Sequence, residues 1–298
     1  MEIIPVDSHI TAIDHDLLGM PGVGVCYVVR GEEVALIETG AALTAPATLA
    51  GLEKLGIKRE DVGHILCTHI HVDHAGGAGI LAQALPRAHV YINRDMIPHL
   101  VDPSRLIASS RRAIGELAWP LHGEMQPVPE DRIRPSDNLH LDLGQDVILD
   151  AIATHGHSPD HTSYWDRRSG GLFIGDAAGL RMDRYNLLLP VTPPPTYDLD
   201  AQLATMAMLR KQPISRLYVT HYGVHDDVDD TLRRGQERLN ELIELVEAAI
   251  KQGNDDVLAL AAKWTPFPAG TPGALVASCW SEMSVAGLMR FLKKRMQG

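Results

Sequence analysis

A cluster of three histidines and one aspartate within six residues constrains this chain more than any other feature. The segment reads His69-Ile70-His71-Val72-Asp73-His74. His69 and His71 are two positions apart, so an extended backbone turns both rings to one side, where they can face one metal ion. Asp73 and His74 lie past the expected bend and can face a second ion. The alternative is a run of solvated loop histidines, which would not require so demanding a spacing.

The residues around this cluster predict a turn between a strand and a helix. The apolar run 64–67 is typical of a buried strand, and the segment from Ala78 to Ala82 is typical of a helix start. Gly76 and Gly77 lie between them, where glycine lets the backbone turn tightly without a side chain filling the cavity. We therefore expect the histidines to lie at the end of a strand, on the edge of a sheet.

Taken with Thr68, the cluster resembles the Thr-His-x-His-x-Asp-His signature of the metallo-β-lactamase superfamily. Three later segments, in the expected order, extend the resemblance over about residues 20 to 225: Gly156-His157-Ser158-Pro159-Asp160-His161, Phe173-Ile174-Gly175-Asp176 and Tyr218-Val219-Thr220-His221-Tyr222-Gly223. The resemblance implies an α/β fold, a four-layer αβ/βα sandwich, with an additional C-terminal helical region. The glyoxalase II and lactonase-like branch, which carries C-terminal helices, is the part of the superfamily that it favours.

The resemblance also implies a set of seven metal ligands around two divalent ions. The first ion would be held by His69, His71 and His157, the second by Asp73, His74 and His221, and Asp176 would bridge them. An imidazole-rich site with a few carboxylates suits zinc, with iron or manganese as alternatives.

Two further residues are expected to lie behind the ligands. Glu38 ends a predicted strand where the superfamily often has an aspartate, so one interpretation is that it orients the histidine loop. The other interpretation, a polar strand end without any link to the metals, stays open. His161 is not a ligand in the family pattern, and we expect it to be buried and hydrogen-bonded.

The implied chemistry is hydrolysis by a hydroxide that the two metal ions share. Such a hydroxide attacks a carbonyl group held against a metal, which favours cleavage of an ester-like bond, a thioester or a lactone, in a small substrate. Asp73 would also act in catalysis, by accepting a hydrogen bond from the hydroxide and passing a proton to the leaving group. Two alternatives stay open: a mononuclear iron oxidoreductase similar to the persulfide dioxygenases, and a metal-containing ligand-binding or regulatory protein with little catalysis.

Composition narrows the classes of partner. The 298 residues, 45% of them hydrophobic, suffice for one large core. A net charge of −11 argues against a nucleic-acid surface, because polyanions bind basic faces. No signal peptide is evident, no apolar run approaches the ~20 residues that span a bilayer, and three scattered cysteines suit a reducing compartment. We expect a cytoplasmic protein that acts on a small molecule, away from membranes, and a homodimer is one possible state.

The chain is expected to divide into a catalytic region, 1–225, and a helical region, 226–298. Within the first, residues 93–128 have the length of an active-site lid. Candidates for the wall of a substrate pocket are Met96, Leu100 and Trp119. Arg111 or Arg112 could bind an acidic group on the substrate. The alternative is that these residues only pack the segment onto the body of the protein or form an oligomer contact. We expect the prolines at 193–195 to form a rigid rim of the site. The helical region is expected to wall the substrate cleft or to mediate dimerisation.

Overall fold

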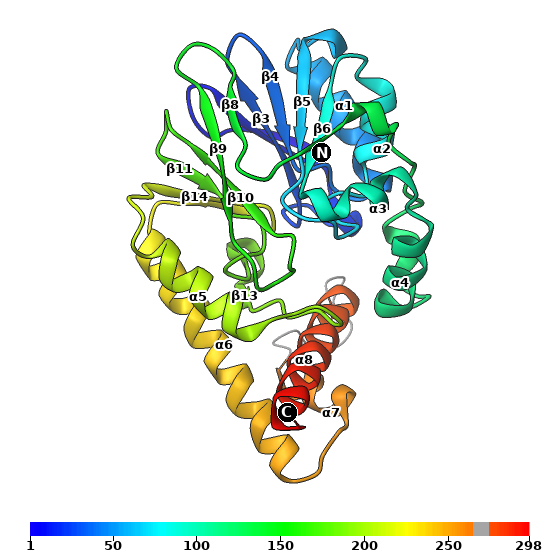
Figure 1. Cartoon of the computed structure of the whole chain (residues 1–298), viewed down its shortest axis with the longest axis vertical. Coiled ribbons are helices and arrows are strands. Elements are labelled where there is room, and N and C mark those ends of the chain that lie inside the picture. The colour runs from blue at the N-terminus through cyan, green and yellow to red at the C-terminus, as the bar shows by residue number, and fades with distance from the viewer. Residues whose placement is uncertain (265–273, 298) are drawn as a thin grey trace.

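Two mixed β-sheets pack face to face in the computed structural model, which describes residues 1–264 and 274–297, and helices cover both outer faces (Figure 1). The first sheet has the order β1-β2-β3-β4-β5-β6-β7 and the second the order β15-β14-β11-β10-β9-β8. The predicted four-layer sandwich with C-terminal helices is therefore confirmed.

The first sheet is antiparallel from β1 to β4 and parallel from β4 to β7. Its strands are β1 (Glu2–Pro5), β2 (Ile10–Asp14), β3 (Val25–Arg30), β4 (Val34–Ile37), β5 (Val62–Leu66), β6 (His89–Ile92) and β7 (Ile133–Pro135). The sequence predicts strands near 23–29, 33–38, 64–67 and 89–92, and all four are present within a few residues. The parallel pairs place the end of β5, and hence the histidine loop, beside the end of β4.

The second sheet is antiparallel except for the parallel pair β11 and β14. Its strands are β8 (His140–Asp142), β9 (Ile148–Ala153), β10 (Thr162–Asp166), β11 (Gly171–Phe173), β14 (Arg216–Val219) and β15 (Gly223–His225). A separate hairpin pairs β12 (Leu180–Met182) with β13 (Leu187–Leu189). The sequence predicts no strand between His221 and the helical region that begins at residue 226, so strand β15 is a correction. Its three residues are too few to show a periodic pattern.

Alternating side chains explain why the sheets form layers. On β3, Cys26 and Val28 pack in the cluster under the first helical layer, while Tyr27 packs with Phe173 and Tyr218 between the sheets. The three rings are close, with centroids 5.2 Å apart for Tyr27 and Phe173 and 4.5 Å for Phe173 and Tyr218. A third cluster lies between the second sheet and its helices. The inner strands of each sheet thus bury both faces, as a sandwich requires.

The helices complete the outer layers and the C-terminal region. They are α1 (Ala45–Lys54), α2 (Ala78–Ala84), α3 (Ile97–Val101), α4 (Ser104–Ile114), α5 (Leu199–Leu209), α6 (Val228–Lys251), α7 (Val257–Trp264) and α8 (Ala274–Gln297). Asp198 caps the N-terminus of α5, because its side chain accepts a hydrogen bond from Ala201 N. The sequence predicts Thr44 as the N-cap of α1, but its hydroxyl donates to Ala41 O and does not cap the helix.

The C-terminal helices form one hydrophobic cluster with the β12–β13 hairpin, and α6, α7 and α8 lie together at one end of the molecule (Figure 1). The apolar spacing in the sequence predicts only two helices in this region, one between residues 229 and 251 and one at the end of the chain, separated by residues 264–268. Helix α7 is therefore a correction. Its last residue is Trp264, and residues 265–268 of the predicted separator lie outside the described residues. No helix among the described residues has the length and apolarity needed to cross a membrane.

Candidate metal centre

The histidine loop runs from the end of β5 to the start of α2 and passes close to neighbouring backbone. A Cβ atom on Gly76 would lie 2.0 Å from Val72 O, and one on Gly77 would lie 2.7 Å from Thr39 O. Glycine is therefore required at both positions by close approach of the backbone and not by a left-handed conformation. The tight loop turns the side chains of residues 69 to 74 inward.

The first group of candidate ligands is His69, His71 and His157, whose ring nitrogens converge. His69 Nε2 lies 2.8 Å from His71 Nδ1 and 3.1 Å from His157 Nε2, and His157 Nε2 lies 2.9 Å from His71 Nδ1. His157 comes from the loop after β9, so the second sheet contributes the third ring. The three nitrogens surround one point.

Hydrogen bonds on the far side of two of these rings fix which nitrogen carries a proton. The Nδ1–H group of His157 donates to Val191 O at 2.9 Å. Thr68 Oγ1 donates to Glu38 at 2.6 Å, so it accepts from His69 Nδ1 at 3.0 Å. In the neutral rings both Nε2 atoms are then lone-pair acceptors that face each other, which is unfavourable without a cation and typical of metal ligands.

The second group is Asp73, His74 and His221, and it follows the same rule. His74 Nδ1 donates to Glu38 Oε1 at 3.0 Å and His221 Nδ1 donates to Val23 O at 2.7 Å. Their Nε2 atoms face each other at 3.2 Å, and Asp73 Oδ2 lies 3.4 Å from that of His221. Imidazole nitrogens and a carboxylate oxygen at this spacing fit a divalent metal ion.

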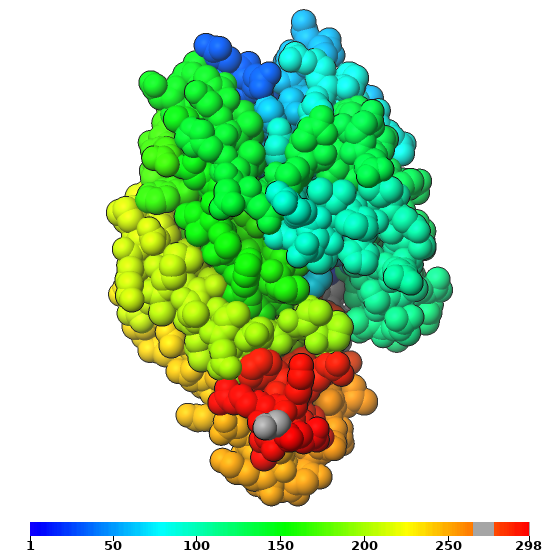
Figure 2. Space-filling view, in the orientation of Figure 1, coloured from blue at the N-terminus to red at the C-terminus, as the bar shows by residue number. Residues whose placement is uncertain are grey.

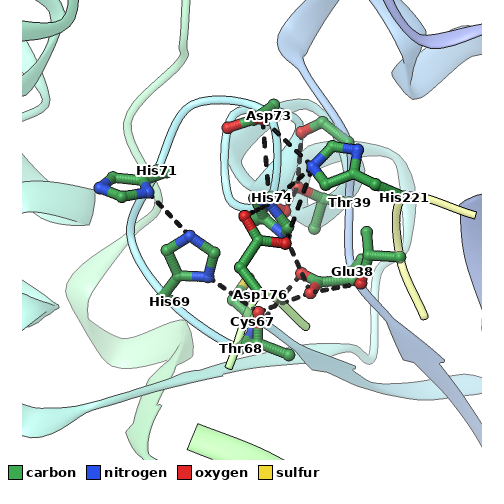
Figure 3. A network of polar contacts seen from close by, with 12 residues as sticks. Glu38, Thr39, Cys67, Thr68, His69, His71, Asp73, His74, Asp176 and His221 are labelled. Atoms are coloured by element: carbon green, nitrogen blue, oxygen red, sulfur yellow. Dashed lines mark hydrogen bonds and ion pairs between the residues drawn. The ribbon is translucent and has the colours of Figure 1, made fainter. Parts of the chain in front are cut away.

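Asp176 lies between the two groups, as Figure 3 shows. Its Oδ2 is 3.5 Å from His74 Nε2 and 3.6 Å from His157 Nε2, and its Oδ1 is 3.8 Å from His221 Nε2. Oδ1 is buried and makes no hydrogen bond within the described part of the chain. A buried carboxylate oxygen without a donor is costly, so this oxygen also fits a metal ligand. The structure thus brings together all seven residues that the sequence singles out.

Electrostatics favour positive charge at this centre. Burial opposes ionisation of Asp176, yet nearby His74 and His221 hold the pKa of its carboxyl well below the usual value. Burial likewise opposes charge on His74, but Asp176 and Glu38 raise its pKa well above normal. Burial lowers the pKa of His157 to about 4, so that ring is neutral and free to bind a metal. A metal cation at this centre would balance the negative charge of the carboxylates and bind the lone pair of the neutral His157 ring.

Two residues behind the ligands hold them in place. Glu38 is fully buried, and its Oε1 accepts hydrogen bonds from Thr68 and His74 (Figure 3). It also accepts one from Thr220 Oγ1 at 3.2 Å. It is therefore linked to the histidine loop and is not an isolated strand end. His161 is also fully buried, and its Nε2 accepts from the backbone N–H of Asp176 at 3.0 Å.

Asp160 is a site residue whose role the sequence does not reveal. Its buried carboxylate accepts a hydrogen bond from Ile70 N at 2.8 Å and so ties the segment that carries His157 to the histidine loop. The two partners are 90 positions apart in the sequence, and no local pattern links them. The only available signal is the position of Asp160 between His157 and His161. His155, in contrast, is exposed and does not line the cavity.

A cavity of about 480 Å³ opens above the metal centre. Five of the candidate ligands line its base, and residues of the lid segment, the proline loop and α8 form its walls: His71, Asp73, His157, Asp176 and His221; Met96, Arg105, Leu106 and Ile114; Pro193, Pro194 and Pro195; Cys279, Trp280 and Met283. The proline rim and the wall of C-terminal helix are where the sequence predicts them.

Within the lid, three of the predicted pocket residues have other contacts. Leu100 and Trp119 are buried in the core cluster under the first sheet and do not line the cavity. Arg111 forms a bidentate ion pair with Glu116, with distances of 2.7 to 3.1 Å. Arg105, six positions earlier, is the lid arginine that lines the cavity. The choice between these residues depends on how α4 is rotated, which its own sequence does not fix.

Comparisons with known sequences agree with this arrangement. The family profile described as the metallo-beta-lactamase superfamily matches residues 19–221. Uncharacterized protein YobT of Bacillus subtilis is 33% identical over 158 residues, which are 52% of this chain and 62% of that protein. The metallo-beta-lactamase fold-containing protein ST1585 of Sulfurisphaera tokodaii is 27% identical over 178 residues, 58% and 63% of the two chains. The alignments therefore span less than two thirds of the length of these relatives.

Solved structures extend the likeness to nearly the whole chain. The archaeal metallo-beta-lactamase superfamily protein ST1585 from Sulfolobus tokodaii superposes with a TM-score of 0.71 at 20% identity, covering 95% of this chain and 99% of that one. The metallo-beta-lactamase family protein TTHA1429 from Thermus thermophilus gives a TM-score of 0.66 at 20% identity, covering 99% and 92%. At these identities the likeness concerns the fold alone. The family match over more than half of the chain nevertheless decides the relationship, and this protein belongs to the metallo-β-lactamase superfamily.

Proposed function

We propose that this protein is a metal-dependent hydrolase that cleaves an ester-type bond, a thioester or a lactone, in a small substrate. The observation that supports the proposal is the convergence of imidazole nitrogens and ionised carboxylates at the base of a cavity of about 480 Å³. Pockets of ~300–1,000 Å³ are typical of sites for small molecules. A net charge of −11 agrees with a small-molecule substrate and not a nucleic acid.

The proposed cofactors are two divalent metal ions, with zinc preferred because imidazole predominates among the ligands. His69, His71 and His157 would hold one ion, Asp73, His74 and His221 the other, and Asp176 would contact both. When bound, such ions polarise a substrate carbonyl and lower the pKa of a water towards ~7.

The residues of the chain supply position, proton transfer and a dry environment. Asp73 is the most exposed carboxylate of the centre, with 17% of its side chain accessible, and it lines the cavity. Burial disfavours its charge, but His74 and His221 hold its pKa below the usual value, so it is ionised at neutral pH. It can therefore accept a proton from an attacking water and deliver it to the leaving group. The apolar walls exclude bulk water around the substrate.

The test combines metal analysis with a substrate panel. We expect the purified protein to bind about two equivalents of zinc and to hydrolyse members of a panel of thioesters, lactones and phosphodiesters, with a preference for the carbonyl compounds. His69→Ala and Asp176→Ala should abolish hydrolysis and lower the zinc content while the circular dichroism spectrum stays unchanged. His140→Ala is the control, because that ring is 60% exposed and pairs with Asp150 away from the cavity.

Two results would contradict the proposal. One is a zinc-loaded protein that cleaves no carbonyl ester in the panel. The other is iron in place of zinc together with turnover of a sulfur substrate and oxygen, which would favour the oxidoreductase alternative.

A further inference from the structure

The walls of the cavity come from two helices that are far apart in the sequence. Helix α4 of the lid presents Leu106, Ser109, Ser110 and Ala113, spaced as one face of a helix. Helix α8 faces it with Trp280 and Met283, and Cys279 Sγ lies 3.9 Å from Ile114 O. In Figure 2 the hollow is visible between α4 and the segment near residues 190–196, above α8. A substrate in this cavity must therefore have a largely apolar body.

Arg105 is the one lysine or arginine that lines the cavity, among the residues that the structure describes. It lines the cavity from the first turn of α4 and is exposed. Among the residues that the structure describes, it makes no ion pair within 4.0 Å and no hydrogen bond through its side chain, whereas Arg111 on the same helix is paired with Glu116. The hydrogen bonds of Ser104 lower the pKa of the exposed Asp102 carboxyl, with Arg105 as a smaller cause. The guanidinium group of Arg105 is thus available to a ligand.

The carboxylates that line the cavity are already committed. They are Asp73, Asp160 and Asp176. Asp73 and Asp176 face the histidines of the metal centre, and Asp160 accepts from Ile70 N. An overall charge of −11 would repel an anionic substrate, so a negative charge at the end of the substrate that lies away from the metal centre needs a cation of its own. A single guanidinium balances one negative charge, which favours a carboxylate over a doubly charged phosphate.

We propose that Arg105 determines substrate specificity by pairing with a carboxylate that the substrate carries in addition to its scissile carbonyl. The substrate class is then an ester or thioester with an apolar body and one free carboxylate, such as a half-ester of a dicarboxylic acid. This orientation rests on the proposed hydrolase function, because the metal centre holds the scissile end. The binding preference itself does not require turnover and is measured separately.

The experiment measures binding of matched, uncleaved ligands to the zinc-loaded protein by calorimetry. The ligands are N-methylamides of linear acids of about six to twelve carbons, a length suited to a small-molecule cavity, ending either in a methyl group or in a carboxylate. In at least one pair, we expect the carboxylate-ended ligand to bind about tenfold more tightly than the methyl-ended one. This factor is at the lower end of the range for a charge-assisted hydrogen bond, because Arg105 is exposed. Arg105→Gln should remove this preference and leave the methyl-ended ligand unaffected.

Arg112→Gln is the matched control, because Arg112 lies on the same helix, is exposed and does not line the cavity. It should behave as the unmodified protein. A preference that survives Arg105→Gln, or a protein that prefers the carboxylate in no pair, overturns the proposal. Where hydrolysis is found, Arg105→Gln should raise KM for half-esters and leave kcat unchanged. Carboxylate-selective binding without any hydrolysis would sustain the role of Arg105 and refute the hydrolase function instead.

Discussion

Replacing Glu38 by glutamine tests whether a residue behind the ligands sets the affinity of the metal centre. Glu38 Oε1 accepts from Thr68 at 2.6 Å, from His74 at 3.0 Å and from Thr220 at 3.2 Å. Glutamine keeps the shape and one acceptor oxygen but loses the charge. It also puts an amide NH₂ group where Oε2 now faces Thr68 N at 3.5 Å, so that two donors oppose each other.

The magnitude follows from the three hydrogen bonds. A bond to a charged acceptor contributes ~1.5–3 kcal/mol and a neutral one ~0.5–1.5 kcal/mol, so each loses about 1 kcal/mol. Three bonds on one oxygen do not add fully, and we expect a total loss of about 2 kcal/mol. If the loss falls on metal binding, zinc affinity drops by about thirtyfold. Mutations of residues that orient metal-bound histidines typically cost ~10–100-fold, which agrees.

The assay is competition for zinc against a fluorescent chelator at neutral pH. Glu33→Gln is the control, because Glu33 Oε2 contacts His64 Nε2 at 2.7 Å, a similar carboxylate–histidine pair that does not line the cavity of the metal centre. We expect Glu38→Gln to weaken zinc binding and Glu33→Gln to leave it unchanged. A zinc affinity of Glu38→Gln within about threefold of the unmodified protein, less than about 1 kcal/mol, would refute the reasoning. So would an equal loss in the control.

Two further predictions concern folding. Burial lowers the pKa of His15 to about 3, against ~6.5 in an unfolded chain, so its contribution to stability is present above about pH 6.5 and is lost as the pH falls towards about 3. Urea unfolding of the metal-free protein at several pH values measures this effect. His15→Leu should reduce the slope of the unfolding free energy against pH between about pH 3 and 6.5 by up to about 1.4 kcal/mol per pH unit. An unchanged slope would contradict the lowered pKa of His15. Gly76→Ala should destabilise the protein by at least ~1–3 kcal/mol and weaken zinc binding, because the added Cβ would lie 2.0 Å from Val72 O. Gly63→Ala is its control, with the nearest atom, on the Glu33 side chain, at 3.6 Å; equal melting temperatures for the two variants would count against the close approach.

The residues of the metal centre could be identified from the sequence because each lies in a short, recognisable segment. Four of them fall within six positions, and His157, Asp176 and His221 each follow a predicted strand. Main-chain geometry then does most of the positioning, since successive parallel strands end at one edge of a sheet. Their role as metal ligands stays a prediction until metal is measured.

Other features could not be predicted because they depend on contacts between distant parts of the chain. The rotation of α4 against α8 decides that Arg105 and not Arg111 lines the cavity. The sequence of either helix alone does not show which element it will pack against. Trp119 is an aromatic residue of the kind that often lines a pocket, but it packs in the core. An aromatic side chain suits both environments, so its type does not distinguish them. Strand β15 and helix α7 are short elements whose patterns are too brief to separate from loops.

The same dependence on distant contacts explains how the two halves of the metal centre keep their spacing. The histidine loop follows β5 of the first sheet, whereas Asp176 and His221 follow β11 and β14 of the second. Tyr27 of the first sheet packs against Phe173 and donates a hydrogen bond to Val219 O at 2.8 Å, two residues before His221. The ring thus fixes the ends of both strands of the second sheet relative to the first. Since packed cores deform little, the distance between the ligand groups is set by the core between the sheets, and a metal ion bound there stabilises the docked sandwich by its binding free energy.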